Sequence, residues 1–271
     1  MRHRIKDARR VVVKLGSNLF FDGENTLALD RISALIEDLA RARLEGRQIL
    51  VVSSGAVALG ASALHRQSAL LVHKQAFAAV GQSRLMNVYE QGFSKHGLIA
   101  AQVLLTSQDF SNPRRFSNLR NTLMTLLEMG VIPVINENDT VATEELEETD
   151  PDHSFSDNDQ LSARVMSRLE ADLLVLLSDV DGLYTGNPSE NPKASLIPEV
   201  HKITSEVEAL AGAKSSRGRG GMATKIQAAG IAMSSGGMAI IANGTKSGVL
   251  RRIFEGETEG TFFLAQAEAK S

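Results

Sequence analysis

Val11-Val12-Val13-Lys14-Leu15-Gly16-Ser17 is the stretch that decides the fold of this 271-residue chain. Three β-branched residues in succession predict a strand, and an unbroken apolar run is typical of a strand that is covered on both faces. The glycine after the run predicts a turn where the strand ends. The stretch therefore predicts a buried strand of a parallel sheet with a lysine near its carboxyl end.

Five more short runs rich in Val, Ile and Leu predict further strands of the same kind. They are Ile49–Val52, Ala101–Leu105, Val131–Ile135, Leu173–Leu177 and Ala239–Ala242. Helix-length segments lie between them, with apolar residues three and four apart, as in Leu29, Ile32, Leu35, Ile36 and Leu39, and in Leu119, Leu123, Leu126 and Leu127. This alternation predicts an α/β fold, a three-layer αβα sandwich with a mainly parallel central sheet.

Composition narrows the class of protein. The chain is 43% hydrophobic and 23% charged and carries a net charge of −3, which is typical of a globular protein. It has no cysteine, which excludes disulfides and cysteine nucleophiles. The apolar runs fall far short of the roughly 20 residues of a membrane helix. We expect a cytoplasmic protein with small-molecule partners, no nucleic acid and no membrane. We expect one domain over residues 1–271, with lobes of about 1–165 and 166–265.

Three glycine-bearing turns are candidates for anion binding. The first is Lys14-Leu15-Gly16-Ser17, the second is Val52–Ala56 and the third is Gly218–Lys225, which opens a helix whose inward residues would be Met222, Ile226, Ala229 and Met233. Such turns present free N–H groups and the positive end of a helix dipole, and a first-turn lysine adds a full charge, which suits polyphosphate. The alternative for each turn taken alone is that its glycines merely make a turn and that any lysine beside it is solvated.

Two clusters of polar residues predict a polar substrate. Asn136-Glu137-Asn138-Asp139-Thr140 follows the run Val131–Ile135, and Asp157-Asn158-Asp159-Gln160 precedes a helix. In the second cluster, Asp157 or Asn158 could simply cap that helix. The acidic stretch Glu144–Asp152 lies between the clusters, and its charge density predicts a solvated loop, with a lid as the alternative. The six histidines have no metal-ligand spacing, so we expect no metal held by the protein.

Taken together, these motifs resemble the amino acid kinase family. The resemblance rests on VVVKLG, SSGAVALG (53–60), KQAFAAVGQSRLM (74–86), VLLT (103–106), VIPVINENDTVAT (131–143), DNDQLSA (157–163), LLSDVDGLYTGNP (176–188) and GRGGMATKIQAA (218–229). AVGQSRLM joined with VINENDTVAT is most similar to the members that phosphorylate the side-chain carboxylate of glutamate at the start of proline synthesis. Many of these members also carry a small C-terminal PUA domain, which we do not expect here.

The resemblance implies roles for individual residues. It implies that Ser54, Asp139 and Asn158 bind glutamate, with Asn136 nearby, and that Lys14 and Lys225 are catalytic. ATP and its Mg²⁺-bound phosphates would be held by Lys14, Ser178, Asp179, Arg219, Gly220, Gly221, Met222, Ala223, Thr224 and Lys225. Ser178 and Arg219 stand where threonine is usual, and Ala223 where serine is usual. A homo-oligomer, dimer or tetramer, is implied as well.

Phosphoryl transfer to a carboxylate agrees with this residue content. An ionised carboxylate is already a nucleophile and needs no general base, so the reaction requires charge neutralisation and in-line positioning instead. Two alternatives stay open. One is another member of the family acting on N-acetylglutamate, aspartate, carbamate or a nucleoside monophosphate, and the other is a non-catalytic nucleotide-binding regulator.

Overall fold

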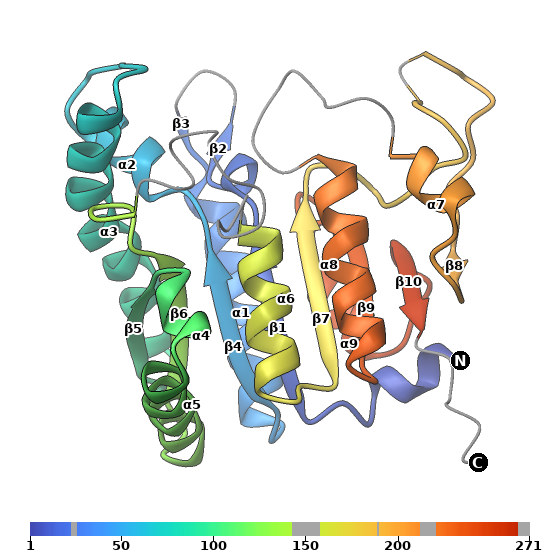
Figure 1. Cartoon of the computed structure of the whole chain (residues 1–271), viewed down its shortest axis with the longest axis horizontal. Coiled ribbons are helices and arrows are strands. Elements are labelled where there is room, and N and C mark those ends of the chain that lie inside the picture. Colours follow the sequence, from blue (N-terminus) through green and yellow to red (C-terminus); the bar gives the residue numbers. More distant parts are fainter. Residues whose placement is uncertain (23–25, 143–157, 189, 212–220, 265–271) are drawn as a thin grey trace.

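One eight-stranded sheet forms the middle of the protein (Figure 1). The computed structural model describes residues 1–22, 26–142, 158–188, 190–211 and 221–264. The strand order is β5 (Ala100–Leu105), β6 (Ile132–Glu137), β4 (Gln48–Ser53), β1 (Arg10–Leu15), β7 (Leu173–Ser178), β9 (Met238–Asn243), β10 (Thr261–Leu264) and β8 (Glu199–Val200). All pairs are parallel except β9 with β10. The predicted mainly parallel α/β sandwich is confirmed.

Helices cover both faces of the sheet (Figure 1). One face carries α1 (Leu29–Leu44), α2 (Ala56–Ala63), α3 (Leu71–Ser94) and α9 (Val249–Phe254). The other carries α4 (Gln108–Ser111), α5 (Pro113–Glu128), α6 (Asn158–Arg168) and α8 (Met222–Ser234). Shorter elements are α7 (Ser205–Ala209), the 3₁₀ turns η1 (Arg2–Ile5) and η2 (Ser17–Leu19), and the hairpin of β2 (Phe21–Asp22) and β3 (Thr26–Leu27). No helix in the described ranges is long and apolar enough to cross a membrane.

Alternate residues of β1 divide the core in two. Val11, Val13 and Leu15 pack with the α1 side, whereas Val12 packs with the α6 and α8 side. Side chains alternate across a strand, so Lys14 lies on the same face as Val12. The first strand therefore sends its lysine toward α6 and α8.

All six predicted strands are present, with small differences. β6 runs on through Asn136 and Glu137, because these residues stay paired with Leu104 and Leu105 of β5. β8 and β10 were not predicted, since two to four residues make no recognisable run. The predicted stripe of α1 is wrong at Leu29, which is exposed because it opens the helix ahead of the turn that packs on the sheet.

Two glycines allow α2 and α3 to cross at backbone contact. A Cβ on Gly60 would lie 1.8 Å from the carbonyl oxygen of Phe77, and a Cβ on Gly81 would lie 1.8 Å from that of Ala56. Neither backbone atom can move without shifting a whole helix. Because α2 begins directly after β4, this crossing fixes the loop of Ser54 and Gly55 relative to α3.

We predict that Gly81→Ala lowers the free energy of unfolding by about 3 kcal/mol or more, since overpacking against rigid backbone outweighs the roughly 1 kcal/mol gained in helix propensity. Gly92→Ala on the same helix is the matched control. The three atoms nearest to its Cβ would all belong to the side chain of Ile36, the closest at 2.7 Å, so a side chain and not a backbone would have to shift. Urea unfolding measures both variants, and equal stability of the two would contradict the crossing as the reason for Gly81.

Candidate active site

The carboxyl ends of β1, β4, β6 and β7 meet at one edge of the sheet, the upper edge in Figure 1. The backbone N–H of Ser54 donates to the carbonyl of Leu15 at 3.1 Å, and that of Gly16 donates to Leu177 at 3.1 Å. Gly55 ends the β4 turn at a φ of 104°, a conformation that favours glycine. In open parallel sheets this edge is where ligands bind.

Two buried lysines share one buried carboxylate at this edge. Lys14 Nζ lies 2.6 Å from Asp159 Oδ1, and Lys225 Nζ lies 3.0 Å from Asp159 Oδ2. The three residues come from β1, α8 and α6, and their exposed fractions are 5%, 5% and 0%. Thr224 Oγ1 also donates to Asp159 Oδ2 at 2.9 Å. The cluster carries a net charge of +1 and thus attracts an anion.

The charge state of Asp159 follows from its two partners. Burial by itself would raise the pKa of this carboxyl, but the positive charges and hydrogen bonds of Lys14 and Lys225 outweigh burial and lower the pKa below its ordinary value. Asp159 is therefore ionised at neutral pH. It holds both ammonium groups at the carboxyl edge.

Helix ends add to the positive potential of the edge. Both α6 and α8 begin there, as Figure 1 shows, so the positive ends of both helix dipoles face the same region. Lys225 lies in the first turn of α8, as predicted, and is buried. Of the predicted inward residues of α8, Ile226 and Ala229 are buried, whereas Met222 and Met233 are partly buried.

A chain of side-chain amides leads away from the lysine cluster. Asn158 Nδ2 donates to the carbonyl of Ser53 at 3.2 Å, to Ser54 Oγ at 2.8 Å and to Asn136 Oδ1 at 3.1 Å. Asn136 Nδ2 in turn donates to Gln82 Oε1 of α3 at 3.0 Å. Three of the predicted substrate residues, Ser54, Asn136 and Asn158, are thus in direct contact.

The Ser53 side chain is also fixed. Tyr89 of α3 is fully buried, and its hydroxyl donates to Ser53 Oγ at 2.8 Å. Burial raises the pKa of Tyr89, so the phenol keeps its proton. Tyr89 therefore holds the end of β4 directly before Ser54.

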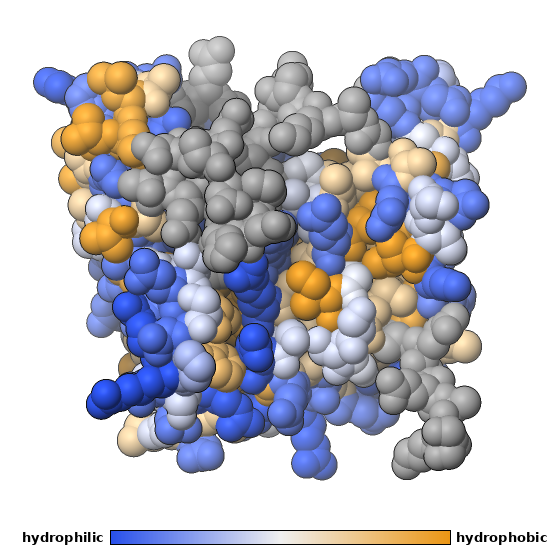
Figure 2. Space-filling model, in the orientation of Figure 1, coloured by the Kyte–Doolittle hydropathy of each residue, from blue (hydrophilic) through white to orange (hydrophobic). Residues whose placement is uncertain are grey.

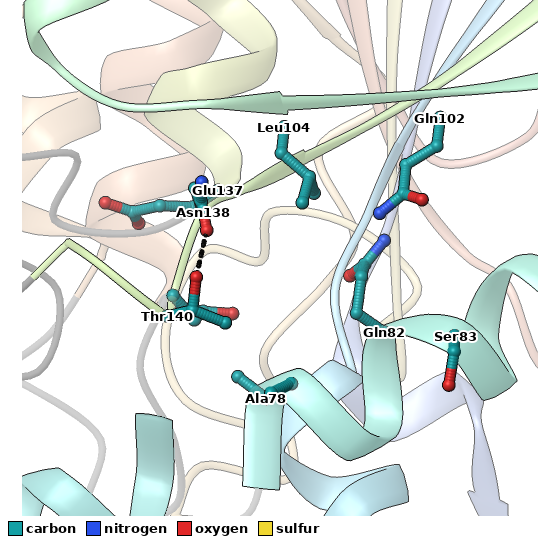
Figure 3. A pocket seen from close by; sticks show the side chains of 10 residues that line it. Ala78, Gln82, Ser83, Gln102, Leu104, Glu137, Asn138 and Thr140 are labelled. Carbon is teal, nitrogen blue, oxygen red and sulfur yellow. Dashed lines mark hydrogen bonds between the residues drawn. The ribbon is translucent and has the colours of Figure 1, made fainter. Parts of the chain in front are cut away.

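A cavity of about 300 Å³ lies at the far end of the amide chain. Figure 3 shows its walls, with Gln82 and Ser83 on α3, Gln102 and Leu104 on β5, and residues of the segment 137–140. Asp139, the fourth predicted substrate residue, lines this cavity and is buried. The lysine cluster does not line it. The chain Asn158–Asn136–Gln82 is what joins the two.

The end of β7 and the start of α8 supply the remaining predicted nucleotide residues that the structure describes. Ser178 is buried, and its Oγ has no hydrogen-bond partner within the described part of the chain. Asp179 is exposed and accepts a hydrogen bond from Asn18 Nδ2 at 2.9 Å. Gly221, Met222, Ala223 and Thr224 open α8 on the same side. Arg219, Gly220 and the acidic stretch Glu144–Asp152 lie outside the described residues.

Sequence reasoning missed three residues that organise the site, namely Asp159, Gln82 and Tyr89. Asp159 had a usable signal, because a carboxylate one residue after the start of an amphipathic helix faces the same edge as the strand ends. Gln82 and Tyr89 sit on the long helix α3 among apolar residues, and their partners are 54 and 36 residues away in sequence. Only the packing of α3 reveals them.

Among the described residues, no group of three His, Asp or Glu side chains is arranged to hold a metal ion. Asp159, the most buried carboxylate of the site, is bound by lysines. The donor set at this edge suits an anion or an anion that brings its own cation.

Comparison with known proteins agrees with these features. The profile of the Amino acid kinase family matches residues 9–243. Glutamate 5-kinase of Pelobacter propionicus is 46% identical over 266 residues, covering 97% of this chain and 69% of the relative. Glutamate 5-kinase of Carboxydothermus hydrogenoformans is 48% identical over 270 residues, covering 97% of this chain and 70% of the relative.

Solved structures agree on the fold. Carbamate kinase from Giardia lamblia bound to AMP-PNP has a TM-score of 0.67 at 16% identity, covering 96% of this chain and 100% of that one. The UMP kinase of Bacillus anthracis has a TM-score of 0.62 at 18% identity, covering 96% and 97%. With a family match over most of its length and relatives near half identity, this chain belongs to the amino acid kinase family.

Proposed function

We propose that this protein transfers the γ-phosphoryl group of ATP to the side-chain carboxylate of L-glutamate, the reaction that opens proline biosynthesis. The observation that carries the proposal is the buried pair of lysines on Asp159, at 2.6 and 3.0 Å, beside a polar cavity. Relatives named Glutamate 5-kinase, near half identical over almost the whole chain, support the same acceptor.

Transfer between two anions is limited by electrostatic repulsion. ATP phosphates and a carboxylate repel each other, so the site has to present positive charge along the line that joins them. Lys14 and Lys225 supply this charge from opposite sides of Asp159, and the N-termini of α6 and α8 add to it. The carboxylate attacks phosphorus directly, and ADP leaves.

Asp159 acts as a positioning residue in this scheme. Two ammonium groups would repel each other in a buried site, and the carboxylate between them lets both stay charged and oriented before any nucleotide arrives. Each lysine can then contact a phosphate oxygen directly, with no water between them. The pre-organised charge lowers the cost of reorganisation during transfer.

Mg²⁺ belongs to the nucleotide in this proposal. It would arrive on the ATP phosphates and neutralise part of their charge. Ser178 and Asp179 at the end of β7 and the opening turn of α8 would hold the nucleotide, with Arg219 and Gly220 completing the loop.

Glutamate would lie on the β4, β6 and α6 side. Ser54 and Asn158 would bind near its side-chain carboxylate, with Asn136 supporting Asn158. Asp139 would take the ammonium group. The acceptor lobe of about residues 1–165 and the nucleotide lobe of about 166–265 then meet at the adjacent strands β1 and β7.

The proposal also includes the formation of a homo-oligomer and a location in the cell. Apolar side chains gather at the α2 and α3 end, at the upper left in Figure 2, where Leu64, Leu70 and Val72 are 43%, 61% and 64% exposed. This surface agrees with a homo-oligomer, dimer or tetramer. A cytoplasmic location agrees with the expected substrates.

A coupled ADP-release assay tests the function. It compares glutamate with N-acetylglutamate, aspartate, carbamate and UMP, each at saturating Mg·ATP. We expect glutamate to be the best acceptor by at least about a hundredfold in kcat/KM. N-acetylglutamate, carbamate and UMP lack the ammonium group that Asp139 would bind, and the side chain of aspartate is one methylene shorter. Preference for another acceptor would replace glutamate as the substrate. ATP binding without ADP release for any acceptor would indicate a non-catalytic regulator.

We predict that Lys225→Met lowers kcat by at least about a hundredfold, since it removes a charge that stabilises the transition state while keeping the volume of the side chain. The exposed Lys202→Met serves as the control for a change in net charge and should keep its kcat. Steady-state kinetics and the thermal midpoint are measured for both. A folded Lys225→Met protein with near wild-type kcat would remove Lys225 from the mechanism.

We predict that Asp159→Asn lowers the free energy of unfolding by about 3 to 5 kcal/mol at pH 7, because it removes the buried counter-charge that both ammonium groups share. The folded pKa of Asp159 is lowered, so its contribution is present above the unfolded pKa of about 4 and is lost as pH falls through the folded pKa. The stability difference from wild type should therefore shrink below about pH 4. Exposed Asp179→Asn should change stability by less than about 0.5 kcal/mol. A pH-independent difference would contradict an ionised Asp159.

We predict that Asp139→Asn raises the KM for glutamate by about tenfold or more and leaves the KM for ATP within about twofold, because a charged hydrogen bond to the ammonium group is lost. N-acetylglutamate, which lacks that charge, should be a poor acceptor for wild type. Equal KM values for glutamate in variant and wild type would show that Asp139 only shapes its own loop.

A further inference from the structure

The directions of the amide groups between β4 and α3 are fixed by chemistry. The carbonyl oxygen of Ser53 can only accept, so Asn158 has to turn its NH₂ group toward it. The same nitrogen donates to Asn136 Oδ1, which leaves the Asn136 NH₂ group to donate to Gln82 Oε1. Gln82 therefore turns its own NH₂ group away from Asn136.

That NH₂ group has no hydrogen-bond partner in the described part of the chain. Gln82 is 8% exposed, its Nε2 is fully buried, and the residue lines the cavity. Figure 3 shows the Gln82 amide nitrogen directed toward the side chain of Gln102, on the neighbouring wall. Buried donors in native proteins nearly always find an acceptor, and the cavity is where a ligand would supply one.

The chemistry of the walls defines the ligand. An NH₂ group only donates, so it selects an acceptor such as a carboxylate. Glu137 and Asp139 line the same cavity and provide negative charge, which suits an ammonium group. About 300 Å³ is ample for a single amino acid. The walls together therefore fit a zwitterion.

The order of the contacts decides which end of the acceptor lies here. Ser54 is bonded through its N–H to Leu15, the neighbour of Lys14, so Ser54 and Asn158 mark the end where phosphoryl transfer takes place. Gln82 lies two hydrogen bonds further along the chain. The group that reaches Gln82 is the end of the amino acid that does not react.

We propose that Gln82 is a specificity residue whose Nε2 donates to the α-carboxylate of the acceptor amino acid. The inference rests on the proposed function and adds to it a residue and a reason for choosing α-amino acids. Gln102 is placed to donate to the same carboxylate, and Asp139 takes the adjacent ammonium. The rival view is that Gln82 merely supports Asn136.

Gln82→Glu separates the two views. The substitution keeps an oxygen that accepts from Asn136 and replaces the donor that faces the cavity with an acceptor. We expect the variant to disfavour glutamate and to favour glutamate 1-amide, in which the α-carboxylate is replaced by a carboxamide that can donate. The ratio of kcat/KM for glutamate to that for glutamate 1-amide should fall by about a hundredfold or more, and the KM for ATP should stay within about twofold.

Three outcomes are distinguishable. A wild-type protein that does not phosphorylate glutamate contradicts the proposed function itself. If wild type is active and Gln82→Glu leaves the substrate ratio unchanged, for example through an equal loss for both substrates, the role of Gln82 is overturned. A fall in the ratio in both Gln82→Glu and Gln82→Ala supports it, because damage to Asn136 would weaken both substrates alike and the alanine variant adds no repelling charge.

Two further variants serve as controls for this experiment. Gln91→Glu makes the same chemical change at an exposed position of α3 that does not line the cavity, so its ratio should equal that of wild type. Should Gln82→Glu fail to fold, Gln82→Ala removes the donor without adding charge. Its ratio should fall by about tenfold, and an unchanged ratio overturns the proposal.

Discussion

The ionised carboxylate of Asp159, buried between Lys14 and Lys225, is the interaction on which the rest of the site depends. A buried charge is tolerated only when it is paired and hydrogen-bonded. Here one carboxylate satisfies two lysines that come from opposite halves of the sequence. The pairing requires α6, α8 and β1 to meet at one point, and the alternation of side chains along β1 provides that meeting by placing Lys14 on the same face as Val12. The charge cluster can therefore form only in a fold that brings α6, α8 and β1 together.

From this cluster, a chain of hydrogen bonds leads toward the cavity through neighbouring residues of α6. Asn158 adjoins Asp159, so fixing the carboxylate also fixes the amide that holds Ser54 and Asn136. Helix α3 closes the arrangement from the other face, because its contact with α2 at Gly60 and Gly81 brings Gln82 and Tyr89 within hydrogen-bond distance of β6 and β4. A backbone contact between two helices thus helps to determine where the side-chain amides of the site lie.

The sequence predicts much of the fold because the physics of its strands is local. A run such as Val11–Val13 has no polar alternation and consists of β-branched residues, so it predicts a strand covered on both faces. The same reasoning cannot find β8, whose two residues contain no period, or the reversal of β10 against β9, which depends on how Thr261–Leu264 returns to the sheet. Leu29 shows the opposite error, where helical spacing places a residue on the apolar stripe but the helix start leaves it in solvent.

The residues of the site also fall into two groups, those that local sequence features predict and those that only the packing reveals. Lys14, Ser54, Asn136 and Lys225 follow from strand ends and glycine turns, since these features are visible within a few residues. Asp159 and Gln82 do not, because their roles come from partners that only the packing of helices supplies. In a chain of hydrogen bonds, the direction of each amide is determined by its neighbour. This chain begins at the carbonyl oxygen of Ser53, which can only accept a hydrogen bond. The direction of the Gln82 donor is therefore a property of the whole chain of contacts, and no single residue encodes it.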